Sequence, residues 1–154
     1  RGNQSASPEE AEAVRLLVVE TLASGATWTN DQGVPAVVTL QDILIIAPYN
    51  AQVFELAERV PGARIGTVDK FQGQQAPIVI YSMTTSSYAD APRGMEFLYS
   101  LNRLNVATSR AKCVCVLVAS PSVFEVRCRT PRQMQLANAF CRYLEMATPV
   151  NASP

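Results

Sequence analysis

Hydrophobic positions along the chain follow two spacings, one typical of helices and one typical of buried strands. After Ser7-Pro8-Glu9-Glu10, which reads as a capping box with proline in the first turn, apolar residues recur every three or four positions. This predicts a helix over about 8–24 that Ser24-Gly25 closes. The same spacing predicts helices from Pro48 to Val60, over 103–111 and over about 132–146. The apolar stripe of the last helix is Met134, Ala137, Phe140, Cys141 and Leu144.

Short, continuous apolar runs lie between these helices. They predict strands at 43–47, 64–68, 78–83 and 113–119, and the last run is the most apolar. Apolar runs without polar alternation are typical of parallel strands that are covered on both faces. The connector 25–42 is expected to hold at most a short edge strand over 36–40, and residues 84–96 are expected to form a polar loop.

Strands that alternate with helices predict an α/β fold, with a mostly parallel sheet flanked by helices. In such folds ligands bind outside the carboxyl ends of the strands. The candidate positions are therefore the loops after Ala47, Val68, Met83 and Ala119.

The chain has 154 residues, of which 48% are hydrophobic and 17% charged, as in a globular domain. We expect one domain over 1–154 with its core over about 8–147. No apolar run reaches the roughly 18 residues that span a bilayer, and the first ten residues do not resemble a signal peptide. These features predict a soluble, cytoplasmic protein with no membrane contact. Because the sequence starts at Arg1, we expect it to be part of a longer protein.

Basic residues are concentrated in the second half of the chain, although the 13 basic and 13 acidic residues balance overall. From Arg93 onward there are seven of the eleven arginines but only three acidic residues, Glu96, Glu125 and Glu145. This asymmetry suits contacts with anions, and a solvated basic face is the alternative.

The absence of histidine removes His-based acid–base chemistry, Ser-His-Asp and Cys-His triads and His-containing zinc sites. The four cysteines are Cys113, Cys115, Cys128 and Cys141. None of them forms a C-x-x-C pair, and the first two lie in the apolar run CVCVLVA. We expect buried free thiols in a reducing cytosol, and no metal site.

Polar segments follow two of the predicted strands. In Ala47-Pro48-Tyr49-Asn50-Ala51-Gln52, either Tyr49 or Gln52 contacts a nucleotide or a nucleic-acid backbone, or the segment is only a strand-to-helix turn. In the segment 66–75, Gly73 would let a backbone N–H approach a phosphate closely. Donors for the same anion are Thr67, Lys70 and Gln72, and a solvated loop is the alternative.

Two arginines share one face of the helix predicted over 103–111. Arg103, Ala107 and Arg110 are at i, i+4 and i+7, which separates the two guanidinium groups by about 10.5 Å along the axis. Such a pair suits a polyphosphate, unless both arginines are simply exposed to solvent.

The segments IIAPYNAQ, TVDKFQGQQAPIVI and RLNVATSRAK resemble, in this order, motifs IV, V and VI of Upf1-like superfamily 1 helicases. The resemblance covers about 8–147 and implies the second RecA-like domain of such a motor. In that family ATP binds between two RecA-like domains, whose opening and closing moves single-stranded DNA or RNA. The first domain supplies the phosphate-binding loop and the Mg²⁺-binding carboxylates. This chain has no G-x-x-x-x-G-K-[ST] loop, so the resemblance implies that ATP with Mg²⁺ binds mainly through the absent first domain.

The resemblance assigns roles by position. Arg110 matches the motif VI arginine finger, which stabilises charge on the transferred γ-phosphate, and Arg103 matches the arginine that supports the cleft. Residues placed near the nucleotide are Gln72, Gly73, Gln75, Arg103 and Tyr49. Residues placed near the nucleic acid are Thr67, Lys70 and Gln52.

Two positions depart from the family pattern. Motif V usually reads Q-G-x-E, and here Gln75 replaces the carboxylate that can hold the ribose, so an amide hydrogen bond takes its place. Relatives often carry arginine just after the motif IV glutamine, whereas Val53 and Phe54 follow Gln52 here. One phosphate contact is therefore unaccounted for.

The sequence predicts the second motor domain of an ATP-dependent helicase, which supplies an arginine finger and part of a single-stranded nucleic-acid track. Its expected partners are single-stranded DNA or RNA and the first RecA-like domain, and the isolated chain should hydrolyse no ATP. An ATPase-inactive, single-stranded nucleic-acid-binding module and an α/β domain for protein interactions are the alternatives.

Overall fold

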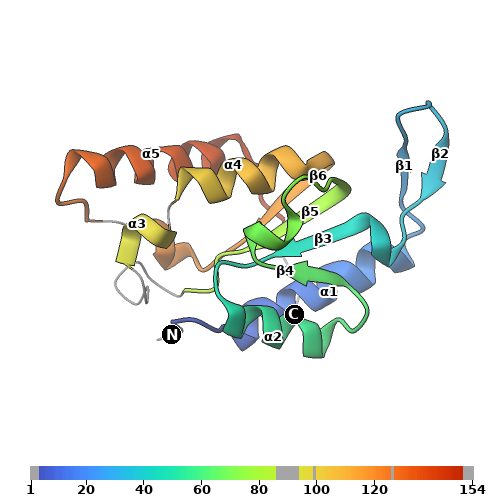
Figure 1. Ribbon diagram of the computed structural model, residues 1–154, viewed down its shortest axis with the longest axis horizontal. Coiled ribbons are helices and arrows are strands. Elements are labelled where there is room, and N and C mark those ends of the chain that lie inside the picture. The colour runs from blue at the N-terminus through green and yellow to red at the C-terminus, as the bar shows by residue number, and fades with distance from the viewer. Residues whose placement is uncertain (1–3, 86–93, 99, 126, 151–154) are drawn as a thin grey trace.

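Four short apolar runs form the central parallel sheet, in the order β4-β3-β5-β6 (Figure 1). The computed structural model describes residues 4–85, 94–98, 100–125 and 127–150. The strands are β3 (Ile43–Ile46), β4 (Arg64–Gly66), β5 (Ala76–Ser82) and β6 (Ala111–Val118). Their register aligns Ile65, Ile45, Ile80 and Val116 in one row across the sheet. The predicted α/β fold with a mostly parallel sheet is confirmed.

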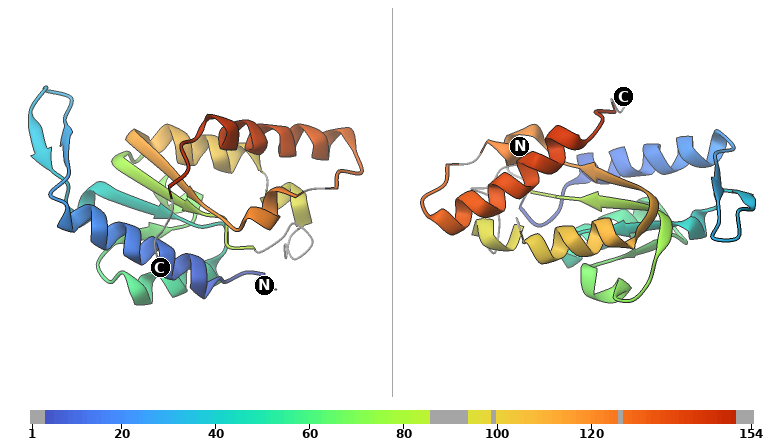
Figure 2. Two further views of the ribbon diagram at one scale, coloured as in Figure 1. Left: turned by 180° about the vertical axis from the view of Figure 1, so that it is seen from behind. Right: turned by 90° about the horizontal axis from the view of Figure 1, so that it is seen from above.

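Helices cover both faces of this sheet, as the views in Figure 2 show. α1 (Pro8–Ala23) and α2 (Asn50–Arg59) pack on one face, where Ile43 and Ile45 point toward them. α4 (Leu101–Arg110) and α5 (Pro131–Met146) pack on the other, toward which Leu44 and Ile46 point. The four side chains of β3 are at most 1% exposed. A strand covered on both faces needs a continuous apolar run, which explains the pattern in the sequence.

All four predicted helices are present, and a fifth was not predicted. α3 (Gly94–Leu98) begins inside the stretch 84–96 that was expected to be a polar loop, of which residues 86–93 lie outside the described part. Among the helices of the described residues, none combines the length and the hydropathy needed to cross a lipid bilayer.

The predicted capping box at the start of α1 is only half correct. The Ser7 hydroxyl accepts a hydrogen bond from the Glu10 backbone N–H at 3.2 Å, as expected of an N-cap. The Glu10 carboxylate, however, turns away from Ser7 and accepts hydrogen bonds from the Ser82 hydroxyl (2.6 Å) and the Thr84 N–H (2.8 Å). The Ser7 N–H donates instead to Gln52 Oε1 at 2.7 Å. Buried polar groups at the end of β5 need these partners, so tertiary contacts replace the local box.

The connector between α1 and β3 forms a hairpin, whose second strand overlaps the short strand predicted over 36–40 and whose first strand was not predicted. β1 (Thr27–Thr29) pairs antiparallel with β2 (Pro35–Val37), and the hairpin projects from the body (Figure 1). The Asn30 side chain accepts hydrogen bonds from the N–H groups of Gln32 and Val34, and Gly33 has φ +74°. This turn chemistry fixes the hairpin. A short 3₁₀ turn, η1 (Leu40–Asp42), leads into β3.

β6 is less buried than its apolar sequence predicts. Cys113 is exposed and the other three cysteines are half-buried, so the prediction of buried thiols is wrong. β6 is the edge strand of the sheet, with a strand neighbour on one side only.

The buried stripe of α5 is narrower than the sequence predicts. Ala137 and Phe140 are buried, whereas Met134 and Leu144 are exposed. α5 lies at the margin of the fold, where only one line of its side chains is covered.

Candidate functional site

A cavity of about 260 Å³ opens where the loops after β3 and β4 meet. Parallel strands end at the same edge of a sheet, which explains why two segments 18 residues apart in sequence, at Tyr49 and Thr67, lie together. The 3₁₀ turn η2 (Val68–Phe71), α3 and α4 complete the wall. Its lining residues are Ser5, Pro48, Tyr49, Asn50, Ala51, Thr67, Val68, Asp69, Phe97 and Arg103.

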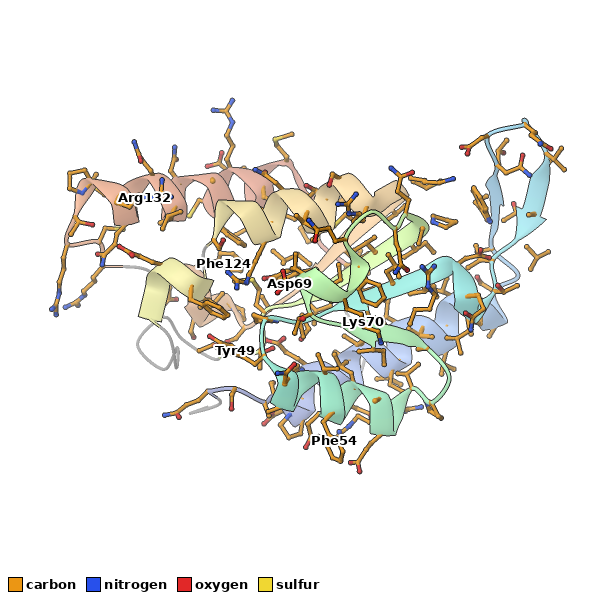
Figure 3. The ribbon with its side chains drawn as sticks, in the orientation of Figure 1. Tyr49, Phe54, Asp69, Lys70, Phe124 and Arg132 are labelled. Carbon is orange, nitrogen blue, oxygen red and sulfur yellow. The ribbon has the colours of Figure 1, made fainter. Side chains whose placement is uncertain are left out.

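Two aromatic rings and a guanidinium group form one wall of this cavity. The ring centroids of Tyr49 and Phe97 are 5.4 Å apart with a 31° tilt. The Arg103 guanidinium carbon lies 3.9 Å from the Phe97 centroid, which is a cation–π contact. Tyr49 and Asp69 lie on the side of the molecule where the strands end (Figure 3). A positive charge that is fixed beside aromatic faces suits a planar or anionic ligand.

Tyr81 lies behind this wall and is a residue that sequence reasoning missed. Burial raises the pKa of its phenol well above the usual range, and the nearby Arg103 charge opposes this shift. Among the described residues no group hydrogen-bonds to the Tyr81 hydroxyl. The signal in the sequence is a tyrosine inside the apolar run PIVIYSM, since a buried hydroxyl usually has a partner. Phe97 and Asp69 were also missed as lining residues, and no local pattern connects Phe97 to Tyr49.

Lys70 lies close to the cavity but is already engaged. Its ammonium group donates a hydrogen bond to the Ile65 carbonyl at 2.7 Å and lies 5.5 Å from the Phe71 ring centroid. The lysine stem crosses Gly66 so closely that a Cβ at this glycine would overlap it. Thr67, in contrast, lines the cavity directly. An ammonium group has three donors, so this bond orients Lys70 without by itself excluding a phosphate contact.

Gln52 has a different role from the direct contact with nucleic acid that the sequence suggested. Its side chain is fully buried and accepts the hydrogen bond from the Ser7 N–H described above. Its amide group donates to the Ser7 carbonyl and to the Ser82 hydroxyl, each at 3.2 Å. Gln52 therefore ties α2 to the start of α1 and the end of β5, and it supports the Tyr49 loop from behind.

The remaining predicted residues gather at the opposite end of α4. Ala76 and Ala111 are register partners and begin the neighbouring strands β5 and β6. The residues before them, Gln75 and Arg110, therefore both lie at the edge of the sheet where these strands begin. α4 also packs against η2, from which the chain continues through Gln72 and Gly73. Arg103 and Arg110 are seven positions apart on α4, which separates them by about 10.5 Å along the helix axis. The structure divides the predicted site between the two ends of one helix.

The second end of the site has an open backbone turn and an unused donor. Gly73 has φ +80°, and no atom lies within 4 Å of where a Cβ would be. This conformation favours glycine and leaves its backbone accessible. The Arg110 Nε is buried and has no hydrogen-bond partner among the described residues. A buried guanidinium N–H without a partner is costly, which is expected where an anion or another domain completes the site.

Comparison with known proteins places this sequence in a family. A family described as "AAA domain" matches residues 1–122. The chain is similar to the "Probable RNA helicase armi" of Drosophila melanogaster, with 36% identity over 98 residues, 58% of this chain and 8% of that protein. It is also similar to the "DNA replication ATP-dependent helicase/nuclease JHS1" of Arabidopsis thaliana, with 29% identity over 134 residues, 86% of this chain and 9% of that protein.

A third relative is the "DNA polymerase alpha-associated DNA helicase A" of Schizosaccharomyces pombe, with 38% identity over 88 residues, 54% of this chain and 13% of that protein. The chain thus spans only a small part of the curated relatives it matches. The family match covers most of the chain, and the relatives are helicases. The chain belongs to this AAA domain family, and within it to the second RecA-like domains of Upf1-like superfamily 1 helicases.

Proposed function

We propose that this chain is the second motor domain of an ATP-dependent helicase, in which Arg110 is the arginine finger. The observation that carries the proposal is the buried Arg110 Nε, which has no partner among the described residues and lies at the end of α4. The register of β5 and β6 brings this arginine to the same edge as Gln75. An arginine finger needs donors that its own domain leaves free, and the unpartnered Arg110 Nε supports this role.

The residues of this chain fit one side of an ATP site. Arg110 and the backbone at Gln72 and Gly73 would face the phosphates, because these groups offer donors around an open turn. Gln75 would donate an amide hydrogen bond to the ribose, and the Tyr49–Arg103 wall, at the other end of α4, would face the base. Bound ATP with Mg²⁺ supplies the phosphoryl group that is transferred. The sequence has no phosphate-binding loop, so most of the phosphate affinity must come from another domain.

The rigid position of Arg110 explains what it would contribute. It is the last residue of α4, and Ala111 starts β6 directly after it. Because both elements hold the Arg110 backbone, its guanidinium group would need little rearrangement to stabilise charge that develops in the transition state. Thr67, at the other end of the site, would donate its hydroxyl to the backbone of a single-stranded nucleic acid.

The test is Arg110→Ala in a helicase that contains both RecA-like domains. We expect ATP turnover to fall by about 10³-fold or more, with ATP affinity and folding unchanged. Arg110→Lys should not restore turnover, because an ammonium group lacks the forked donors of guanidinium. Arg142→Ala, on the exposed side of α5, is the matched control and should keep full turnover. Parental turnover in Arg110→Ala at saturating nucleic acid would refute the proposal.

A single-stranded nucleic-acid-binding module without ATPase function is the second candidate. It is favoured by Gln75, which replaces the motif V carboxylate, and by the absence of arginine after Gln52. Val53 packs against the core at that position and Phe54 is 64% exposed. The coding sequence upstream of Arg1 separates the candidates, because the motor requires a phosphate-binding loop there. Steady ATP hydrolysis by residues 1–154 alone would contradict both.

A further inference from the structure

We propose that Arg127, Arg129 and Arg132 form a second contact surface for the phosphate backbone of a single-stranded nucleic acid. We call this surface the arginine cluster. It would extend the contact with the nucleic acid beyond the cavity at Tyr49 and Thr67. The inference rests on the proposed function, because it assumes that the chain binds single-stranded nucleic acid. None of the three helicase motifs includes these residues.

The arginine cluster carries uncompensated positive charge. Its three side chains fall within six positions of the sequence, and all three residues are exposed. Among the described residues, none of them forms an ion pair, whereas Arg15, Arg59 and Lys112 do. The acidic residues on neighbouring segments, Glu96 of α3 and Glu125, are not paired with the cluster either. Three exposed guanidinium groups on a chain whose charges balance overall are a local electrostatic footprint for an anion.

Hydrogen bonds between side chains and backbone hold the start of α5, next to these arginines. The Thr130 hydroxyl accepts from the Gln133 N–H at 3.1 Å and caps α5. The Gln133 side chain in turn accepts from the Arg129 N–H at 2.7 Å. These reciprocal bonds fix Arg129 and Arg132 on either side of the helix start, where the 16-residue α5 adds its own partial positive charge. The backbone that carries Arg129 and Arg132 is therefore held in place before any ligand binds.

The cluster and the cavity occupy the same edge of the sheet. The segment after β6 passes through the 3₁₀ turn η4 (Pro121–Phe124) to the start of α5, so it follows the carboxyl end of β6. The cavity lies at the carboxyl ends of β3 and β4. β6 is two strand positions from β3, about 10 Å at the usual strand spacing. α3, whose Phe97 lines the cavity, packs against α5. Arg132 lies near the start of α5, on the same side of the molecule as Tyr49 (Figure 3).

The chemistry of the cluster favours phosphates over bases. Guanidinium groups bind phosphate oxygens through two parallel N–H donors. Such contacts carry no sequence information but release counterions, which makes the affinity depend on salt. A strand that leaves the cavity along this edge would therefore meet three positive charges in succession.

The test measures binding of fluorescein-labelled dT20 to the 154-residue chain by anisotropy, between 50 and 200 mM salt. Each phosphate contact on a single strand contributes about 0.7 to the slope of log affinity against log salt. We expect the triple variant R127Q/R129Q/R132Q to lower this slope by about 2 and to weaken binding at least 10-fold at 50 mM salt. The triple lysine variant R127K/R129K/R132K, which keeps the charges, should retain most of the slope. Arg142→Gln, farther along α5, is the control and should remove less than half a unit of slope.

The outcomes separate this inference from the proposed function. An unchanged slope in the glutamine variant, with the parental chain still binding dT20, overturns the arginine cluster alone and indicates that it faces another partner, such as an acidic protein surface. Equal losses in the lysine and glutamine variants also overturn it, because charge would then not be the cause. Circular dichroism confirms that each variant is folded. The loss of ATP turnover in Arg110→Ala tests the motor role independently of this assay.

Discussion

Glu10 is a buried carboxyl whose ionisation should reduce the stability of this domain. It is 8% exposed, and its Oε2 accepts hydrogen bonds from the Ser82 hydroxyl and the Thr84 N–H. Burial raises its pKa from the ordinary 4.5 to about 7, against the hydrogen bonds of Ser82, Thr84 and the Ser120 backbone, which lower it. Between these two pH values the folded state binds more protons than the unfolded state. Stability should therefore fall as the pH rises from about 4.5 to 7, and stay level above 7 as far as Glu10 is concerned.

The size of the effect follows from the same two pKa values. A difference from 4.5 to about 7 corresponds to about 3 kcal/mol of unfolding free energy, of which about 2.5 kcal/mol falls between pH 5 and pH 8. Glu10→Gln removes the charge but keeps an oxygen that accepts from Thr84 and Ser82. The unfolding free energy of the variant minus that of the parental chain should therefore rise by about 2.5 kcal/mol between pH 5 and pH 8.

Urea unfolding followed by circular dichroism at pH 5, 6, 7 and 8 measures this difference. Other groups also titrate in this range, so the quantity that matters is the difference between variant and parental chain at each pH. Glu20→Gln, at the exposed end of the same helix, is the matched control and should show a constant difference. If Glu10→Gln also differs from the parental chain by a constant amount, Glu10 does not titrate within the fold and the reasoning is wrong.

Two further predictions concern residues whose placement differed from the sequence prediction. Gln52→Ala should lower the unfolding free energy by about 2–4 kcal/mol, because it opens a cavity and leaves the buried Ser7 N–H without an acceptor. Urea unfolding measures this loss, and a stable variant with weaker dT20 binding would instead indicate a direct nucleic-acid contact. Cys113 should react with a thiol reagent such as dithiobis-nitrobenzoate before the other three cysteines, since it alone is exposed. A Cys113→Ser variant that keeps the fast-reacting thiol would contradict this placement.

The sequence alone determined the fold class and the order of the elements. Continuous apolar runs such as 43–46 specify buried parallel strands because both faces of the sheet are covered, and helical spacing marks the helices between them. It also determined the candidate segments, of which the structure places Tyr49 and Thr67 at the carboxyl ends of the strands, and Gln75 and Arg110 at the amino ends. The i, i+7 relation placed Arg103 and Arg110 on one helix, α4, which the structure has. These features depend on the periodicity of residues that are close together in the sequence.

Only the tertiary structure decided which of these side chains are available. Nothing in the sequence distinguishes Gln52 and Lys70 from ligand-binding residues. In the structure Gln52 accepts a hydrogen bond from Ser7, 45 positions away, and Lys70 donates one to Ile65, five positions away. Cys113 lies in the most apolar run and is exposed, because burial depends on whether a strand is central or at the edge. Phe97 reaches Tyr49 across the fold with no local signal. Burial and partnership are properties of residues that are distant in sequence, so no spacing rule could have supplied them.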